Sequence, residues 1–273
     1  MKKIVFILCY SFLALGSFAG TVDTVTIYSN SMKRNIKCVV IRPDSYSKDK
    51  TKKYPVVYFL HGYGGSYSNA ITRVPQLKEH ADTYQLIIVC PDGGFSSWYF
   101  DSEVDEKFKF ETHISTEVVN YIDKNFRTIA DKEHRAIMGN SMGGHGALFI
   151  ALRHPDIFGA VASISGGMDL EILKSKYDIS KRIGDTITHA KEFHDLSVIN
   201  LIEKYPNTKL KISIDCGIRD IFIDPNRRFH QKLLELKIPH DYTERPGEHS
   251  WEYWRKSMPY QLLFFSNYFN KIE

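Results

Sequence analysis

The sequence predicts an α/β fold in which a mostly parallel central sheet is covered by helices on both faces. The chain has 273 residues, of which 43% are hydrophobic and 25% are charged, an ordinary composition for a globular protein with a large core. Short apolar runs, such as residues 54–60 and 86–90, alternate with longer amphipathic runs, such as 112–125. Strands that are apolar throughout are typical of parallel sheets, because the crossover helices bury both faces.

The expected elements follow one another along the chain. Residues 22–28 and 36–41 should form an early antiparallel pair, because a polar turn at Asn30-Ser31 separates them. The later strands are expected at 54–60, 86–90, 136–138, 160–164 and 210–214, with a short one near Tyr242, and the helices at 112–125, 147–153, 227–236 and 253–270. No internal repeat or long linker divides this pattern, so residues 20–273 are expected to form a single domain.

The first 19 residues have the pattern of a secretory signal peptide. A basic start at Lys2-Lys3 precedes an apolar run over residues 4–15, and the small residues Ser17 and Ala19 indicate cleavage after Ala19. The apolar run is shorter than the roughly 18 residues that a membrane-spanning helix needs. We therefore expect a secreted or periplasmic protein without a stable membrane anchor.

Charge and cysteine content argue against several kinds of partner and cofactor. The formal net charge of +4 would fall to +2 with the loss of Lys2 and Lys3, and no basic stripe interleaves with aromatic residues, so nucleic acid is not an expected partner. The three cysteines after residue 19 (Cys38, Cys90 and Cys216) allow at most one disulfide and do not demand it. No cluster of cysteine and histidine has metal-ligand spacing, so we expect no metal and no cofactor.

Residues 139–143, Gly-Asn-Ser-Met-Gly, fit the pattern G-x-S-x-G between an expected strand and an expected helix. In this context the serine occupies a sharp turn with unfavourable backbone angles, and the flanking glycines let strand and helix approach closely. The turn projects the hydroxyl group above the sheet, beside a helix N-terminus that favours negative charge. Ser141 is therefore the candidate nucleophile.

A serine nucleophile needs a base and an acid that orients the base, and both are expected after later strands. Of the eleven histidines, His249 lies in the loop between the last expected strand and the last expected helix, which is where the base belongs. Asp220 follows the strand at 210–214 and lies between Ser141 and His249 in the chain, so it is the preferred acid. Asp224, four residues further on, is the alternative.

The loop after the strand at 54–60 reads Leu-His-Gly-Tyr-Gly-Gly over residues 60–65. Its glycines allow backbone N–H groups to face a cavity, so the N–H of Tyr63, together with that of Met142, is the expected oxyanion hole. His61 is expected to brace this loop rather than to react.

Aromatic residues near these loops are candidates for substrate binding. Trp98 and Tyr99 follow the strand at 86–90, and Trp251 stands two residues after His249. Exposed aromatic rings bind sugars or aryl acids by stacking, although the same residues are equally common in protein cores. The segment 168–209 is charged, is expected to be helical and is expected to cover the site.

Seven stretches together resemble a known family. They are H-G-Y-G-G-S at 61–66, P-D-G-G at 91–94, G-N-S-M-G-G-H-G-A-L at 139–148, H-P-D-I-F-G-A at 154–160, S-G-G at 165–167, C-G-I-R-D at 216–220 and G-E-H-S-W-E-Y-W at 247–254. With these stretches the chain resembles the esterase D-like, carbohydrate esterase family 1-type group of α/β-hydrolases. The resemblance implies the α/β-hydrolase fold, a triad of Ser141, Asp220 and His249, and an oxyanion hole made by the N–H groups of Tyr63 and Met142.

The group includes feruloyl and acetyl-xylan esterases, S-formylglutathione hydrolases and the antigen 85 mycolyltransferases. The resemblance therefore implies a serine carboxylic-ester hydrolase that acts through an acyl-enzyme. A signal peptide and aromatic loops favour a carbohydrate-type esterase that removes feruloyl or acetyl groups from plant polysaccharide. The alternatives are a general short-chain acyl esterase, a thioesterase similar to S-formylglutathione hydrolase, an acyltransferase, and a carbohydrate-binding protein without activity.

Overall fold

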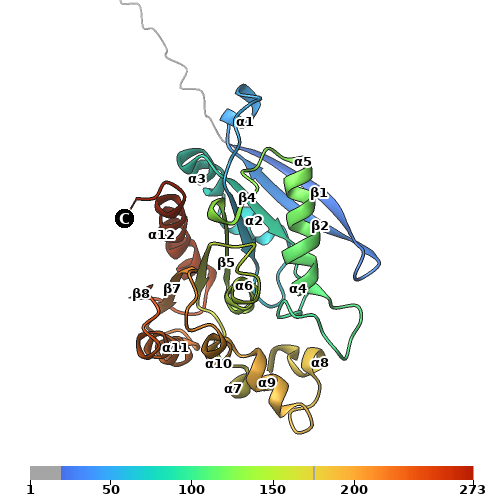
Figure 1. Cartoon of the computed structure of the whole chain (residues 1–273), viewed down its shortest axis with the longest axis vertical. Helices are drawn as coiled ribbons and strands as arrows, with labels where there is room; N and C mark the ends of the chain where they lie inside the picture. Colours follow the sequence, from blue (N-terminus) through green and yellow to red (C-terminus); the bar gives the residue numbers. More distant parts are fainter. Residues whose placement is uncertain (1–19, 175, 273) are drawn as a thin grey trace, which may run out of the picture.

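A computed structural model describes residues 20–174 and 176–272, and in this part of the chain one eight-stranded sheet forms the centre (Figure 1). The strands in spatial order are β1 (Thr21–Ser29), β2 (Arg34–Arg42), β4 (Ile87–Pro91), β3 (Val56–Leu60), β5 (Arg135–Asn140), β6 (Ala160–Ile164), β7 (Lys211–Gly217) and β8 (His240–Arg245). The β1–β2 and β2–β4 pairs are antiparallel and all later pairs are parallel. The predicted fold class is therefore confirmed.

Each expected strand is present, and several are longer than the apolar runs suggested, including the two that precede Ser141 and Asp220. β5 continues to Asn140, so Ser141 follows it directly, and β7 continues to Gly217, three residues before Asp220. Apart from Cys216, the additional residues are polar or glycine, which a pattern of apolar residues does not include. The expected signal peptide at residues 1–19 lies outside the described residues.

The helices join successive strands and cover the sheet. They are α1 (Ser45–Lys48), α2 (Asn69–Arg73), α3 (Leu77–Tyr84), α4 (Phe110–Thr112), the π-helix η1 (His113–Val118), α5 (Val119–Asn125), α6 (Met142–Arg153), α7 (Leu170–Leu173), α8 (Ser180–Ile183), α9 (Ala190–Leu196), α10 (Val198–Leu201), α11 (Ile223–Glu235) and α12 (Trp251–Phe269), with 3₁₀ turns at Lys132–His134, Lys176–Asp178 and Ile202–Lys204. The helix expected at 112–125 is thus one continuous stretch whose middle turn is a π-helix. α11 begins four residues earlier than expected, so its first turn includes Asp224.

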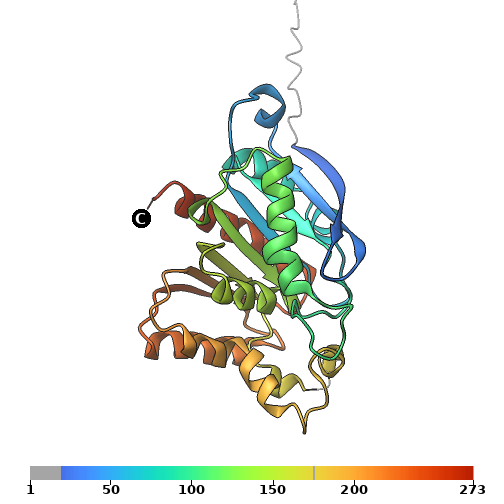
Figure 2. The ribbon, with the colours of Figure 1, turned by 45° about the vertical axis from the view of Figure 1, so that its right-hand side comes forward.

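Side chains that alternate along β3 fill two separate cores. Tyr58 and Leu60 belong to a core shared with α5, α6 and α11, whereas Val57 and Phe59 belong to a core shared with α2, α3 and α12. Figures 1 and 2 show these two groups of helices on opposite sides of the sheet. A strand buried on both faces must be apolar at every position, which explains the continuous apolar runs.

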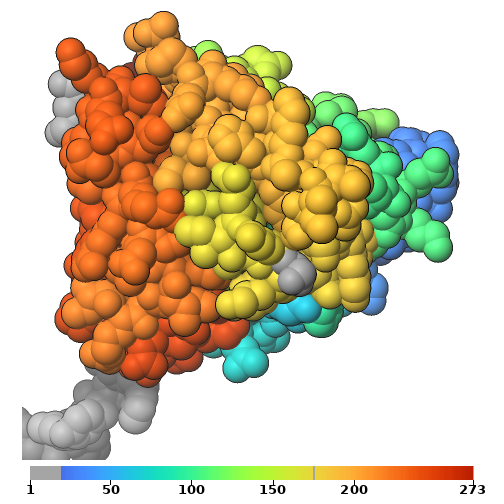
Figure 3. Space-filling model, turned by 90° about the horizontal axis from the view of Figure 1, so that it is seen from below, coloured from blue at the N-terminus to red at the C-terminus, as the bar shows by residue number. Residues whose placement is uncertain are grey.

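The segment 168–209, called the insert below, joins β6 to β7 and contains α7, α8, α9 and α10. It lies at one end of the sheet (Figure 1), and in the space-filling view it covers the middle of that face, between the orange C-terminal part and the green segment after β4 (Figure 3). The imidazole of His145 on α6 lies 3.0 Å from the Leu196 carbonyl oxygen, to which it donates through Nε2, and this contact fastens α9 to the body of the protein.

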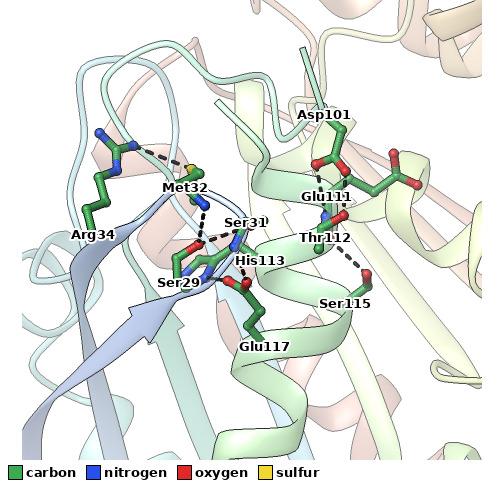
Figure 4. Close-up of polar contacts among 10 residues, drawn as sticks. All are labelled: Ser29, Ser31, Met32, Arg34, Asp101, Glu111, Thr112, His113, Ser115 and Glu117. Atoms are coloured by element: carbon green, nitrogen blue, oxygen red, sulfur yellow. Dashed lines mark hydrogen bonds and ion pairs between the residues drawn. The ribbon is translucent and has the colours of Figure 1, made fainter. Parts of the chain in front are cut away.

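The π-helix is fastened to the turn between β1 and β2 (Figure 4). Glu117 accepts a hydrogen bond from the Ser31 backbone N–H at 2.8 Å and a second from His113 Nδ1 at 2.7 Å. Within the turn, Ser29 Oγ accepts from the Met32 N–H at 3.1 Å. The carboxylate of Glu117 therefore joins the outer hairpin to the helix that packs under the sheet.

Two findings bear on the expectations about membranes and thiols. Within residues 20–174 and 176–272, no helix combines the length and apolar character needed to cross a bilayer. Cys38, Cys90 and Cys216 are all buried as free thiols. Burial raises the pKa of Cys90 to about 12, because a thiolate is poorly solvated in the core. These thiols therefore stay protonated and act as packing groups at neutral pH.

Candidate active site

Ser141 occupies the sharp turn between β5 and α6. Its backbone angles are φ 58° and ψ −119°, a combination that is strained for any residue with a side chain. A Cβ atom placed on Gly143 would clash with the carbonyl oxygen of Leu60, and one placed on Gly139 would clash with the carbonyl oxygen of Gly143. Only glycine at positions 139 and 143 allows α6 to pack this closely against β3 and β5. The two glycines therefore make the sharp turn at Ser141 sterically possible.

Three loops at the carboxyl ends of parallel strands bring Ser141, His249 and Asp220 together. His249 Nε2 lies 2.8 Å from Ser141 Oγ, and His249 Nδ1 lies 2.9 and 3.0 Å from the two carboxylate oxygens of Asp220. The serine is only 8% exposed and the aspartate 3% exposed. A buried carboxylate at Nδ1 holds the proton on that nitrogen, which leaves Nε2 free to accept the proton of the serine hydroxyl.

Asp220 is held in place by its own turn. Its backbone N–H donates to the Gly217 carbonyl at 2.9 Å, and its Oδ1 accepts from the Phe222 N–H at 2.8 Å. Asp224, the alternative from the sequence, lies in the first turn of α11, where its side chain is 86% exposed and faces Arg227. The structure brings Asp220, and not Asp224, to the histidine.

Aromatic rings flank the imidazole of His249. The Phe222 ring lies 4.8 Å from it and the Trp254 ring 5.0 Å from it, both edge to face. Trp251, the substrate-binding candidate, packs against Trp254 at 5.2 Å and is partly exposed. The sequence reasoning missed Phe222 and Trp254, although Phe222 stands only two residues after Asp220.

The two backbone N–H groups expected to form the oxyanion hole have no hydrogen-bond partner in the part of the chain that the structure describes. Met142 is the first residue of α6, so its N–H has no partner within the helix. In the loop after β3, Gly64 donates to Phe95 and Gly65 to Gly62, whereas no acceptor is found for Tyr63 N–H among the described residues. A Cβ on Gly62 would lie 3.2 Å from Ser141 Cβ, which places this loop directly against the serine.

His61 joins two of the loops around the site. Its Nδ1 donates to the Gly62 carbonyl at 2.8 Å, and its Nε2 accepts from the Gly93 N–H at 2.8 Å. Burial lowers the pKa of His61, so the ring stays neutral and keeps both hydrogen bonds. These contacts agree with the expectation that His61 braces the loop.

Trp98 and Tyr99, the candidates for a substrate wall that could equally belong to the core, lie in the core. Both are fully buried, and both have left-handed backbone angles (φ 53° and 62°) that turn their rings inward. Tyr99 packs on Gly146 and donates from its hydroxyl to the His61 carbonyl at 3.0 Å, while Trp98 packs 5.6 Å from His145. This part of the prediction is wrong, because the sequence does not show which way a turn points its rings.

Other aromatic rings contact one another in the loops beside the site. Tyr63 contacts Phe95, which is 59% exposed, and it also contacts Tyr177 of the insert. Tyr177 was missed because the insert carries no motif. Its position becomes apparent only when the insert is folded against the loop after β3.

The fold and the three-residue arrangement define an α/β-hydrolase whose nucleophile, acid and base follow one another in the order serine, aspartate, histidine. A family model described as "Putative esterase" matches residues 29–265, so the chain belongs to this esterase family and is a carboxylic ester hydrolase.

Relatives agree with this assignment. The chain is 25% identical over 250 residues to an acetyl esterase of Caldicellulosiruptor saccharolyticus, a match that covers 85% of this chain and 93% of that protein. It is 34% identical over 160 residues to an endo-1,4-beta-xylanase/feruloyl esterase of Xylanibacter ruminicola, covering 54% of this chain and 22% of the longer protein. A solved ferulic acid esterase structure superposes with a TM-score of 0.80 at 30% identity, covering 93% of this chain and all of that one.

Proposed function

We propose that this protein is a serine esterase of carbohydrate type, which removes feruloyl or acetyl groups from plant polysaccharide. The observation that carries the proposal is the continuous hydrogen-bonded chain from Ser141 Oγ through His249 to Asp220 at a strained turn. The similarity to an acetyl esterase and to feruloyl esterases supports this choice of acyl group. The signal-like segment at residues 1–19 supports export from the cell.

The reaction would proceed in two halves. Ser141 Oγ attacks the ester carbonyl while His249 Nε2 takes the hydroxyl proton, and Asp220 stabilises the imidazolium that forms. The N–H groups of Met142 and Tyr63 donate to the oxyanion, aided by the N-terminus of α6. His249 then protonates the leaving alcohol, and water repeats the sequence on the acyl-enzyme, which releases the acid and restores Ser141.

Replacing the nucleophile tests this assignment. The Ser141→Ala variant should lose at least about 10³-fold in kcat on simple acyl esters, and a fluorophosphonate should label the wild type but not the variant. Thermal unfolding of the variant serves as the control for folding. Turnover by the variant at the wild-type rate would refute the role of Ser141.

The substrate class needs a panel of esters. Methyl ferulate, acetylated xylan, short-chain acyl esters and a glutathione thioester separate the carbohydrate-type reaction from the general esterase and from the thioesterase. Product analysis with and without a sugar acceptor separates hydrolysis from acyl transfer. Activity restricted to the thioester would overturn the carbohydrate-type assignment.

A further inference from the structure

Two consecutive residues of the insert have a strained backbone beside the site. Tyr177 has φ 54° and ψ 34°, and Asp178 has φ 56°, so both lie in the left-handed region although neither is glycine. Such conformations persist only where the surrounding structure holds them, and they cluster at ligand-binding positions. Contacts with the rest of the protein must therefore maintain the left-handed conformation of Tyr177 and Asp178.

Side chains from two different loops hold the turn in place. Trp98 Nε1 donates to the Tyr177 carbonyl at 3.1 Å, and the Tyr63 hydroxyl donates to Asp178 Oδ2 at 3.1 Å. Asp178 also pairs with Lys181 of the insert at 2.9 Å. Trp98 is itself in a left-handed conformation, so one strained turn holds another.

The Tyr177 ring completes a row of aromatic rings that reaches the imidazole of His249. It lies 5.5 Å from the Tyr63 ring and 6.2 Å from the Phe222 ring. Tyr63 continues the row to Phe95 at 4.9 Å, and Phe222 continues it to His249 at 4.8 Å. Tyr177 itself is partly exposed.

Two members of this row belong to the site itself. Tyr63 supplies a proposed oxyanion N–H, and His249 bonds to Ser141 Oγ at 2.8 Å. An ester whose carbonyl binds at Ser141 Oγ can place one of its substituents along the row, because Phe222 contacts the imidazole that bonds to this hydroxyl. Flat rings that meet edge to face favour a planar, unsaturated substituent over a small alkyl group.

We propose that Tyr177 is a specificity-determining residue that packs against the planar acyl group of an aryl-conjugated ester, and that Trp98 and Asp178 are positioning residues that hold it there. This inference rests on the proposed esterase function and adds to it the side chain that selects the acyl group. The alcohol leaves from the other side of the carbonyl and does not depend on Tyr177.

The test compares two methyl esters with the same leaving alcohol, methyl ferulate and methyl butyrate, in a pH-stat assay. Tyr177→Ala should lower kcat/KM on methyl ferulate about tenfold, mainly through a higher KM. The same variant should change kcat/KM on methyl butyrate by less than about twofold. Tyr177→Phe keeps the flat ring and should retain wild-type values on both esters. An equal loss on both esters, or no loss on methyl ferulate, would overturn the inference.

Further variants test whether the loss of activity arises only from a general loss of protein stability. Tyr177→Leu keeps apolar volume without a flat face, and it should show the same selective loss even if the alanine variant is poorly folded. Asp178→Ala removes the acceptor for Tyr63 and should lower kcat/KM on methyl ferulate by about two- to fivefold, whereas Asp178→Asn keeps an acceptor oxygen and should not. Thermal unfolding identifies any variant that is poorly folded, and the Tyr177→Leu variant decides the test if Tyr177→Ala is one of them.

The wild-type protein separates this inference from the proposed function. A wild type that cleaves methyl butyrate but not methyl ferulate refutes the selection of an aryl acyl group and leaves the esterase intact. A wild type that cleaves neither ester and takes up no fluorophosphonate refutes the esterase itself.

Discussion

The hydroxyl group of Tyr63 donates a hydrogen bond to Asp178 at 3.1 Å, across 115 positions of the chain. The backbone N–H of the same tyrosine lies in the loop beside Ser141. One residue therefore joins the proposed oxyanion loop to the insert, so the position of the insert and the geometry of the site are coupled.

Tyr63→Phe removes this coupling without touching the backbone N–H. We expect the turn at 176–178 to open more readily, because the lost hydrogen bond contributes about 1 kcal/mol. Hydrogen exchange of the insert should become faster while kcat on methyl butyrate stays within about threefold. Unchanged exchange of residues 176–183 would show that the hydroxyl does not fasten the insert.

Asp220→Asn should reduce kcat by roughly 10³- to 10⁴-fold, because a neutral amide no longer stabilises the imidazolium or selects the proton position on His249. Asp224→Asn is the matched control, since this side chain is 86% exposed and faces Arg227 rather than the histidine. Its activity should equal that of the wild type. A similar loss in both variants would contradict the assignment of Asp220.

Gly143→Ala should destabilise the protein by about 2 kcal/mol or more, because the added Cβ clashes with the Leu60 carbonyl and forces α6 away from β3. Gly64→Ala is the comparison. At Gly64 the added carbon meets only the Phe95 ring at 3.6 Å, so the left-handed backbone (φ 70°) is the main cost, about 1 kcal/mol. Urea unfolding measures both values, and equal losses would contradict the steric argument.

His145 should make the fold sensitive to mild acid. Burial lowers the pKa of His145 to about 3, while its hydrogen bond to Leu196 acts in the opposite direction. The ordinary value near 6.5 applies to the unfolded chain, so the unfolded state binds more protons as the pH falls below 6.5. The contribution of the neutral His145 to the free energy of unfolding is therefore fully present above pH 6.5, and it is lost progressively between pH 6.5 and about 3.

The His145→Gln variant tests this pH dependence. Glutamine can still donate to the Leu196 carbonyl but does not titrate. Between pH 7.5 and pH 5 the wild type should lose more free energy of unfolding than the variant, by about 1 to 2 kcal/mol. Parallel stability curves for the two proteins over this range would exclude His145 as the cause.

Much of the fold and the nucleophile could be predicted because they depend on local patterns. A strand buried on both faces has to be apolar along its length, as in β3 and β4. The turn at Ser141 requires glycine at 139 and 143 because of close contacts between neighbouring segments of the chain. The predicted residues Ser141, His249 and Asp220 lie within hydrogen-bonding distance because parallel strands end at the same edge of the sheet.

The walls of the site could not be predicted in the same way. Trp98 and Tyr99 were candidates for substrate binding that could equally belong to the core, and the structure buries both, each with a left-handed backbone. The rings of Tyr63, Tyr177 and Phe222 come instead from three distant segments. Nothing local in the sequence shows that these segments meet.

The sequence by itself therefore determined the order of the strands along the chain and the nucleophile, because periodicity and steric requirements are local. It also limited the acid and the base of the triad to a few candidates in the order serine, aspartate, histidine. The tertiary structure decided which aspartate reaches His249 and which aromatic rings meet beside the site. The physical reason is that the direction of a side chain depends on backbone angles and on packing between segments far apart in the chain, and the pattern of residue types specifies neither.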